Sequence, residues 1–165
     1  MLWRRHRTPR TRHAARGRIE IAIEKALDVS APLRRVFGAC SGVERLPELM
    51  PHLREARPVA VDHHHWTMDD TAGPPIEWDT VVTKYGCDRC IEWETAPGSV
   101  IRHSGRLTFR RNDDGSTRVT VGLSYVLPPG HFGERVAALV GAEDLDESLR
   151  SWRARVEGRS VRSPA

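Results

Sequence analysis

A chain of 165 residues, of which 39% are hydrophobic and 29% charged, has the length and composition of one soluble domain with its own core. No apolar run reaches the roughly 18 residues that a membrane-spanning helix requires, and no apolar segment follows the basic start, so we expect neither a membrane span nor a secretory signal. Three cysteines do not suit a disulfide framework and favour a reducing, cytoplasmic location.

The net charge of +4 is distributed unevenly along the chain. Residues 1–18 contain seven arginines and no acidic residue, whereas the rest of the chain is slightly acidic. A nucleic-acid-binding body is therefore not indicated. We predict that residues 1–17 form a basic, disordered tail. The interpretations open for it are a plain solvated leader, contact with an anionic membrane, contact with RNA phosphates, and an organelle-targeting segment.

The first folded elements are expected from Arg18 onward. The segment "RIEIAIEKALDVSA" alternates apolar and polar residues, as a half-buried strand does. Ser30 and Pro32 mark the start of a helix over "PLRRVFGAC". The segment "GVERLPELMPHL" predicts a second short helix or turn, which Pro47 and Pro51 interrupt.

Strand patterns dominate from Glu55 to Leu127. The segments are "EARPVAV", "HWTMDD", "IEWDTVVTKY", "CIEWETA", "GRLTFRR" and "TRVTVGLSYVL", separated by turn sequences such as "APGS" and "NDDGS". Their alternation predicts an antiparallel sheet with one apolar face and one charged face. The apolar face is expected to carry Trp78, Thr80, Trp93, Phe109, Val121, Leu123 and Tyr125.

The C-terminal part is expected to cover the apolar face of the sheet. After "PPG" ends the last strand, "HFGERVAALVG" shows helical spacing that includes Val136 and Leu139. Asp144 and Glu147 form a capping-box-like start of a longer helix. One stripe of this helix carries Leu145, Leu149, Trp152 and Val156. The predicted fold class is α+β: a strand, two short helices, an antiparallel curved sheet and a long C-terminal helix over it.

Two polar clusters raise the question of a metal site: the histidine triplet His63, His64 and His65, and the "CDRC" segment that ends at Cys90. Successive strand residues face opposite sides, so at most two of the histidines could chelate one ion, and no second CxxC or helical histidine pair supplies the missing ligands. The CxxC also does not open a helix, as a redox motif would. We predict no metal site, and expect the histidines at a hairpin, with His64 next to the apolar interior.

Motifs for known catalysts and cofactors are absent, because the chain has no G-x-S-x-G, Walker A or G-x-G-x-x-G sequence. We therefore predict no cofactor. The inward hydroxyls of Thr80 and Tyr125 most simply bond to the backbone. The candidates for a general acid or base are Tyr125 and His64, with Arg102 or His103 expected at the mouth of the apolar site.

The order of these elements resembles the helix-grip fold of the START-like (SRPBCC) superfamily, nearest to its polyketide cyclase/dehydrase or coenzyme-Q-binding-like group. The resemblance is carried by "VERLPELMPHLREARPV", "GPPIEWDTVVTK", "GRLTFRRNDDGSTRVTVGLSYVLPPGHFGERVAALVG" and "LRSWRARVE". It covers residues 18–158, which leaves 1–17 and 159–165 as tails. It implies an apolar cavity between the sheet and the C-terminal helix. Its members bind lipids or quinones, cyclise poly-β-keto chains or associate with ribosomes. We match no catalytic set position by position.

The leading hypothesis is a module that binds a hydrophobic small molecule, such as a lipid, an isoprenoid quinone or a polyketide-like aromatic compound. The alternatives are a polyketide aromatase/cyclase or dehydratase, and an accessory protein that the arginine tail attaches to a membrane or ribosome. A monomer and a homodimer are both compatible with the sequence. The residues expected to line the ligand site are Trp78, Thr80, Trp93, Phe109, Val121, Leu123, Tyr125, Val136, Leu139, Leu149 and Trp152.

Overall fold

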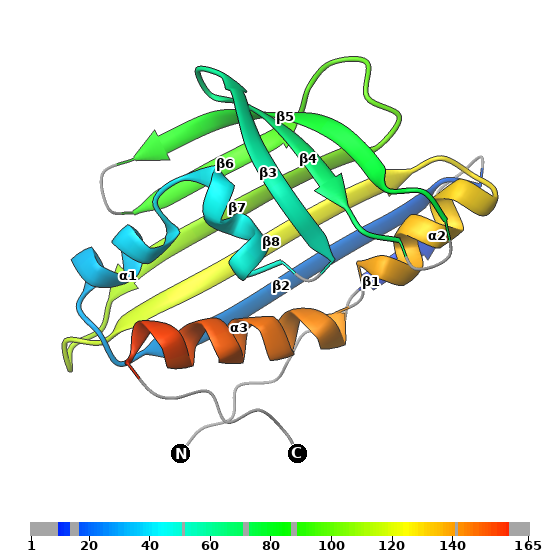
Figure 1. The fold of residues 1–165 in the computed structure, drawn as a ribbon. Coiled ribbons are helices and arrows are strands. Elements are labelled where there is room, and N and C mark those ends of the chain that lie inside the picture. Colours follow the sequence, from blue (N-terminus) through cyan, green and yellow to red (C-terminus); the bar gives the residue numbers. More distant parts are fainter. Residues whose placement is uncertain are drawn as a thin grey trace.

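The computed structural model describes residues 10–13, 17–50, 52–70, 73–86, 89–140 and 142–158, with α+β architecture (Figure 1). These residues form one antiparallel eight-stranded sheet in the order β1-β2-β8-β7-β6-β5-β4-β3. The strands are β1 (Arg10–His13), β2 (Ile19–Val29), β3 (Leu53–Ala60), β4 (His63–Met68), β5 (Ile76–Gly86), β6 (Cys90–Thr95), β7 (Arg102–Arg111) and β8 (Thr117–Leu127). The helices are α1 (Leu33–Cys40), the 3-10 helix η1 (Val43–Glu48), α2 (His131–Leu139) and α3 (Ala142–Val156).

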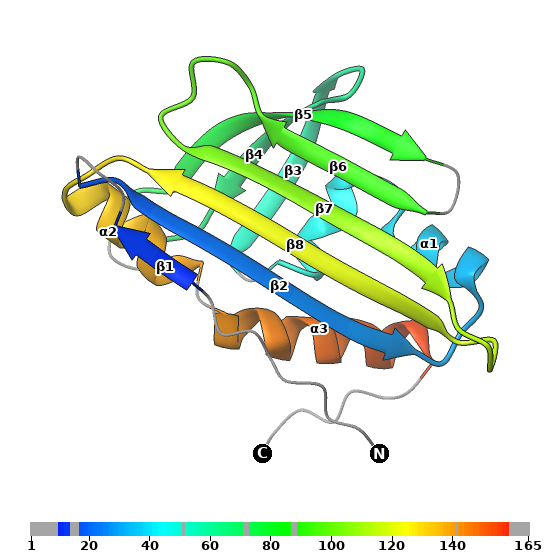
Figure 2. The same cartoon turned by 180° about the vertical axis from the view of Figure 1, so that it is seen from behind.

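The helices gather on one side of the curved sheet. Helix α3 runs alongside β2 and also contacts α1, while α2 contacts β2 and β8 (Figure 1). Seen from behind, the other face of β2, β8, β7 and β6 has none of the described helices across it (Figure 2). This arrangement confirms the predicted architecture and gives the sheet one covered face, which we call the inward face.

The alternation of the strands produces the dry inward face. Along β2 and β8 nearly every second residue is buried, and the residues between them are partly or fully exposed. The predicted stripe of α3 faces this core, because Leu145, Leu149, Trp152 and Val156 are all buried. Burial of these side chains at roughly 25 cal/mol per Å² of apolar surface holds α3 to the sheet.

The structure differs from the sequence predictions near both ends. Within the predicted disordered tail 1–17, β1 (Arg10–His13) pairs with Ile19–Ala22 of β2; the remainder, except Gly17, lies outside the described residues. The physical reason is that the outer edge of β2 offers unpaired backbone groups, which bind a neighbouring strand without any apolar pattern in it. Helix α3 begins at Ala142, two residues before the predicted start. None of the described helices is long and apolar enough to cross a membrane.

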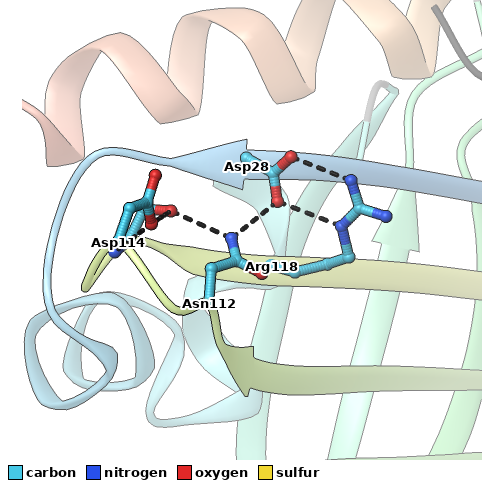
Figure 3. Close-up of polar contacts among 5 residues, drawn as sticks. Asp28, Asn112, Asp114 and Arg118 are labelled. Atoms are coloured by element: carbon cyan, nitrogen blue, oxygen red, sulfur yellow. Dashed lines mark hydrogen bonds and ion pairs between the residues drawn. The ribbon is translucent and has the colours of Figure 1, made fainter. Parts of the chain in front are cut away.

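The hairpin of β7 and β8 is closed by a polar network at its end (Figure 3). Asp28 accepts hydrogen bonds from Arg118 Nε at 3.0 Å and Nη2 at 2.8 Å, and from Asn112 Nδ2 at 2.9 Å. Asp28 and Arg118 are register partners on β2 and β8. The Arg118 hydrogen bond is the largest influence on the carboxyl and lowers the pKa of Asp28. The network thus ties β2 to the β7–β8 turn on the outward face.

Candidate functional site

The register of the sheet aligns five protic residues across five neighbouring strands on the inward face. His103 lies opposite Tyr125, Thr80 opposite Thr95, and His64 opposite Thr80. Thr95 completes the alignment, because its hydroxyl accepts a hydrogen bond from the backbone N–H of His103 at 3.3 Å. We call Tyr125, His103, Thr95, Thr80 and His64 the protic row.

At the centre of this row, four rings surround the imidazole of His103. Tyr125 stacks on it with ring centroids 4.3 Å apart. Trp66, Trp78 and Trp93 lie at centroid distances of 5.6, 6.3 and 6.2 Å. His103 itself is only 2% exposed. We call these five residues the aromatic cage.

The hydrogen bonds of His103 determine its tautomer. Trp93 Nε1 donates to His103 Nε2 at 3.0 Å, so Nε2 carries no proton. His103 Nδ1 lies 3.0 Å from the carbonyl oxygen of Ser124 and therefore donates to it. Burial lowers the pKa of His103 to about 4, against the smaller opposing effect of the Ser124 carbonyl. The imidazole is thus neutral at pH 7 with both nitrogens engaged, and is not available as an acid or base.

Three indole donors and one imidazole nitrogen in the core lack a hydrogen-bond partner among the described residues. They are Nε1 of Trp66, Trp78 and Trp152, and Nδ1 of His64. All four side chains are buried. A buried polar group with no partner costs about 1–3 kcal/mol, so these atoms are places where a bound molecule with complementary groups would gain affinity.

His64 is linked to the 3-10 helix η1 through its other nitrogen. Its Nε2 lies 3.6 Å from Oε2 of Glu44. Desolvation is the largest influence and lowers the pKa of His64, while the neighbouring Glu44 opposes it. The carboxylate of Glu44 folds back over Gly42, where an added Cβ would lie 2.7 Å from it. The imidazole is therefore held between β4 and η1.

A second polar contact on the inward face joins the sheet to its covering helix. Lys25 follows Ile19, Ile21 and Ile23 in the inward alternation of β2 and is only 8% exposed. Its Nζ lies 2.9 Å from Oδ2 of Asp146 on α3. This ion pair fixes α3 against the sheet at a position where the packing is otherwise apolar.

Comparison with known proteins decides the family. The family described as "Polyketide cyclase / dehydrase and lipid transport" matches residues 29–153. The chain belongs to this family. No curated protein matches the chain.

Several solved structures share the fold of this chain. Protein DR_A0006 from Deinococcus radiodurans is 23% identical, with a TM-score of 0.69 and coverage of 82% of this chain and 96% of that one. A START superfamily protein from Mycobacterium smegmatis is 20% identical (TM-score 0.61; 83% and 97% covered). The Zhui aromatase/cyclase from Streptomyces sp. R1128 is 16% identical (TM-score 0.62; 84% and 94% covered). At these identities the likeness concerns the fold.

The residues predicted to line a ligand site lie in or against one core, but they do not all lie together. Trp78, Trp93 and Tyr125 belong to the aromatic cage. Phe109 instead contacts Phe37 of α1, with ring centroids 5.2 Å apart. Among the remaining predicted residues, Leu139 is partly buried and packs against the core. The others are buried, namely Thr80, Val121, Leu123, Val136, Leu149 and Trp152. Their role as a ligand site stays a prediction.

Two predictions about individual polar residues can be compared with the structure. The hydroxyl of Thr80 donates to the backbone oxygen of His64 at 3.4 Å, which is the simple structural role expected for it. Arg102 or His103 was expected at the mouth of the site, and His103 does not lie there, because the large rings around it bury it. Arg102, the adjacent residue, is exposed.

Three important residues were missed from the sequence. Trp66 follows the histidine triplet and shares the inward alternation of His64, which could have assigned it to the core. Lys25 occupies an inward position of β2, but its charge argued against burial. Glu44 could not be connected to His64, because that contact joins segments 20 residues apart in the chain through the tertiary fold.

The histidine triplet is divided between different environments. His63 lies at the hairpin start, with Nδ1 3.0 Å from the carbonyl oxygen of Val61. His65 faces outward and lies 2.8 Å from Oδ1 of Asp79. Among the described residues, no three His, Cys, Asp or Glu side chains form a group that could hold a metal ion. Burial raises the pKa of the Cys40 thiol to about 12, and Cys87 lies outside the described residues.

Proposed function

We propose that this member of the polyketide cyclase/dehydrase and lipid transport family binds a hydrophobic small molecule between the inward face of the sheet and the helices α2 and α3. The observation that carries the proposal is the aromatic cage, in which four large rings surround a neutral histidine and the indole N–H groups of Trp66 and Trp78 have no partner in the described structure. Apolar contact would supply most of the affinity, at roughly 25 cal/mol per Å².

The candidate ligands are a lipid, an isoprenoid quinone and a polyketide-like aromatic compound. The cage favours a flat, conjugated molecule, because aromatic rings gain stability from stacked or edge-to-face contact beyond the burial of their area. Trp152 of α3 supplies a further indole N–H with no partner in the described structure, on the covering side. Ligand oxygens that accept from these donors would determine the orientation of the molecule.

Native mass spectrometry of the full chain, purified without detergent or solvent, tests this proposal. We expect a small-molecule adduct that solvent extraction removes and that rebinds with a change in tryptophan fluorescence. Two variants of β8 form a matched pair: Leu123→Phe adds bulk to the buried inward face, and Ser124→Phe adds the same ring to the exposed face. Rebinding should weaken only in Leu123→Phe. A chain that carries no adduct and binds no hydrocarbon probe contradicts the proposal.

A cyclase or dehydratase activity is the second candidate, and the family description supports it. Such chemistry needs a general acid or base next to the ligand. Burial raises the pKa of Tyr125, so its phenol would act as a proton donor rather than as a base at pH 7. Comparing the products of a reactive poly-ketone with no protein, the wild type and Tyr125→Phe tests this activity. Identical product distributions in all three leave binding as the function.

The proposed attachment to a membrane or ribosome through the arginine tail requires a narrower deletion than the sequence suggested. Because β1 (Arg10–His13) pairs with β2, removal of residues 1–17 would also remove a strand. Deleting residues 1–9 keeps the sheet intact. If sedimentation with anionic liposomes and with ribosomes is unchanged by this deletion, the attachment hypothesis fails.

A further inference from the structure

The strand pair β4–β5 brings three residues, each with an unpartnered polar side-chain atom, to adjacent positions on the inward face. His64 lies opposite Thr80, and Trp66 lies opposite Trp78 two residues farther along. His64 and Trp66 are on the same face of β4, because residues two apart in a strand point the same way. Within the described structure, His64 Nδ1 and both indole Nε1 atoms have no hydrogen-bond partner. We call these three residues, which occupy adjacent positions on one face of the strand pair, the patch.

The two indoles are donors that the cage leaves unused. The rings of Trp66 and Trp78 are 5.8 Å apart and both contact His103. His103 cannot accept from them, because its Nε2 already accepts from Trp93 and its Nδ1 donates to Ser124. An indole nitrogen can only donate a hydrogen bond, so each of these two N–H groups needs an acceptor, such as an oxygen atom of a bound molecule.

The imidazole of His64 is an acceptor beside these donors. The Glu44 carboxylate, 3.6 Å from Nε2, favours the proton on Nε2 and leaves the lone pair on Nδ1. The other charged or titratable groups that act on it are Asp62 and His63. The hydroxyl of Thr80 does not occupy Nδ1, because it donates to the backbone oxygen of His64. The patch thus presents two N–H donors and one nitrogen acceptor.

We propose that His64, Trp66 and Trp78 form a subsite for the oxygenated ring of a hydroxy-ketone, whose carbonyl accepts from the indoles and whose hydroxyl donates to His64 Nδ1. This inference depends on the proposed function and names its ligand class. A hydrocarbon chain offers neither group, and a quinone offers carbonyls without a hydroxyl. Only a molecule with both groups satisfies the donors and the acceptor together, which avoids the cost of leaving them buried and unpaired.

Matched probes can separate the two halves of the subsite. Naphthalene and 1-naphthol differ by a hydroxyl, and tetralin and 1-tetralone differ by a carbonyl. Equilibrium dialysis against the full chain gives four dissociation constants. We expect His64→Phe to raise the dissociation constant of 1-naphthol about fivefold and to change that of naphthalene little. Trp66→Phe and Trp78→Phe should each raise the dissociation constant of 1-tetralone about fivefold and change that of tetralin little. His65→Phe changes the outward-facing neighbour on β4 and should alter neither pair.

The outcomes distinguish this inference from the proposed function. If the hydrocarbons bind and the variants weaken hydrocarbons and oxygenated probes equally, the polar subsite is wrong while hydrophobic binding stands. If no probe binds, including the hydrocarbons, the proposed function itself fails. Should a tryptophan variant not fold, the wild type still decides: the indole N–H resonances of Trp66 and Trp78 should move downfield with 1-tetralone and not with tetralin. Equal shifts with both probes overturn the assignment.

Discussion

The imidazole of His103 lies against the ring of Tyr125 at register-opposite positions of β7 and β8, with their planes 20° apart. Three tryptophans also contact His103, and both His103 and Tyr125 are buried away from water. The consequence is electrostatic: charged forms of either side chain are unfavourable here, so burial lowers the pKa of His103 and raises that of Tyr125. The centre of the inward face is therefore aromatic, protic and neutral.

Acidification should destabilise the protein through His103. Its pKa falls from 6.5 in the unfolded chain to about 4 in the folded one, so between these values the unfolded state binds the proton first. The stability is fully present above pH 6.5 and decreases by about 3 kcal/mol as the pH falls toward 4. Urea unfolding of wild type and His103→Phe at several pH values measures it. We expect the difference in the free energy of unfolding between the two proteins to become smaller as the pH falls. If the two free energies change in parallel with pH, this explanation is contradicted.

Gly105→Ala should disrupt the aromatic cage. A Cβ at Gly105 would lie 1.9 Å from the ring of Trp93, so the indole must move and lose its bond to His103. We expect a loss of roughly 1–3 kcal/mol in the free energy of unfolding and a red shift in tryptophan emission. Gly122→Ala on β8 is the control, because the nearest atom there is 4.0 Å away. Equal losses in both variants would mean that strand glycines, not the cage, set the effect.

Asp146→Ala should weaken the attachment of α3 to the sheet. The variant leaves the ammonium of Lys25 buried without the carboxylate that lies 2.9 Å from it. We expect a loss of about 2 kcal/mol, measured by chemical denaturation. Glu147→Ala, at the next and exposed position of α3, should cost little. The double variant Lys25→Met/Asp146→Ala should recover stability relative to Asp146→Ala, and a further loss would argue against the ion pair as the cause.

Asp28→Asn should lower the free energy of unfolding slightly, and only at pH values at which the carboxyl group of Asp28 is ionised. The pair with Arg118 is largely exposed, so we expect a loss of at most about 1 kcal/mol at pH 7. The folded pKa lies below the unfolded value of 3.8, so the contribution is present above that value and disappears as the pH falls through the folded pKa. Thermal unfolding at pH 7 and pH 3 measures it, with Asp113→Asn in the same turn as the control. Because the contribution declines below pH 3.8, a loss of the same size at both pH values would not come from ionisation of Asp28.

Local sequence patterns were sufficient to predict the architecture and much of the core. The alternation of β8 and the stripe of α3 are properties of single segments, since each side chain's direction follows from its position in its own element. The same reasoning put the histidine triplet at a hairpin, where β4 begins at His63. The resemblance to the polyketide cyclase/dehydrase group likewise depended on the order of such segments, and the family comparison confirmed it.

The site required information that no single segment contains. Which residue of β7 faces Tyr125, or which of β5 faces His64, is set by the register between strands, and a one-residue shift would turn each partner to the other side. The burial of Lys25 and the contact of Glu44 with His64 depend on where α3 and η1 come to rest against the sheet. The alternation within single strands and helices was enough to predict a sheet with one dry, aromatic face and helices that cover it. The alignment of the protic row and the unpaired indole donors appear only in the tertiary structure. The reason is that the partners of a side chain on a neighbouring strand depend on strand register and helix packing, which are set by contacts between residues far apart in the sequence.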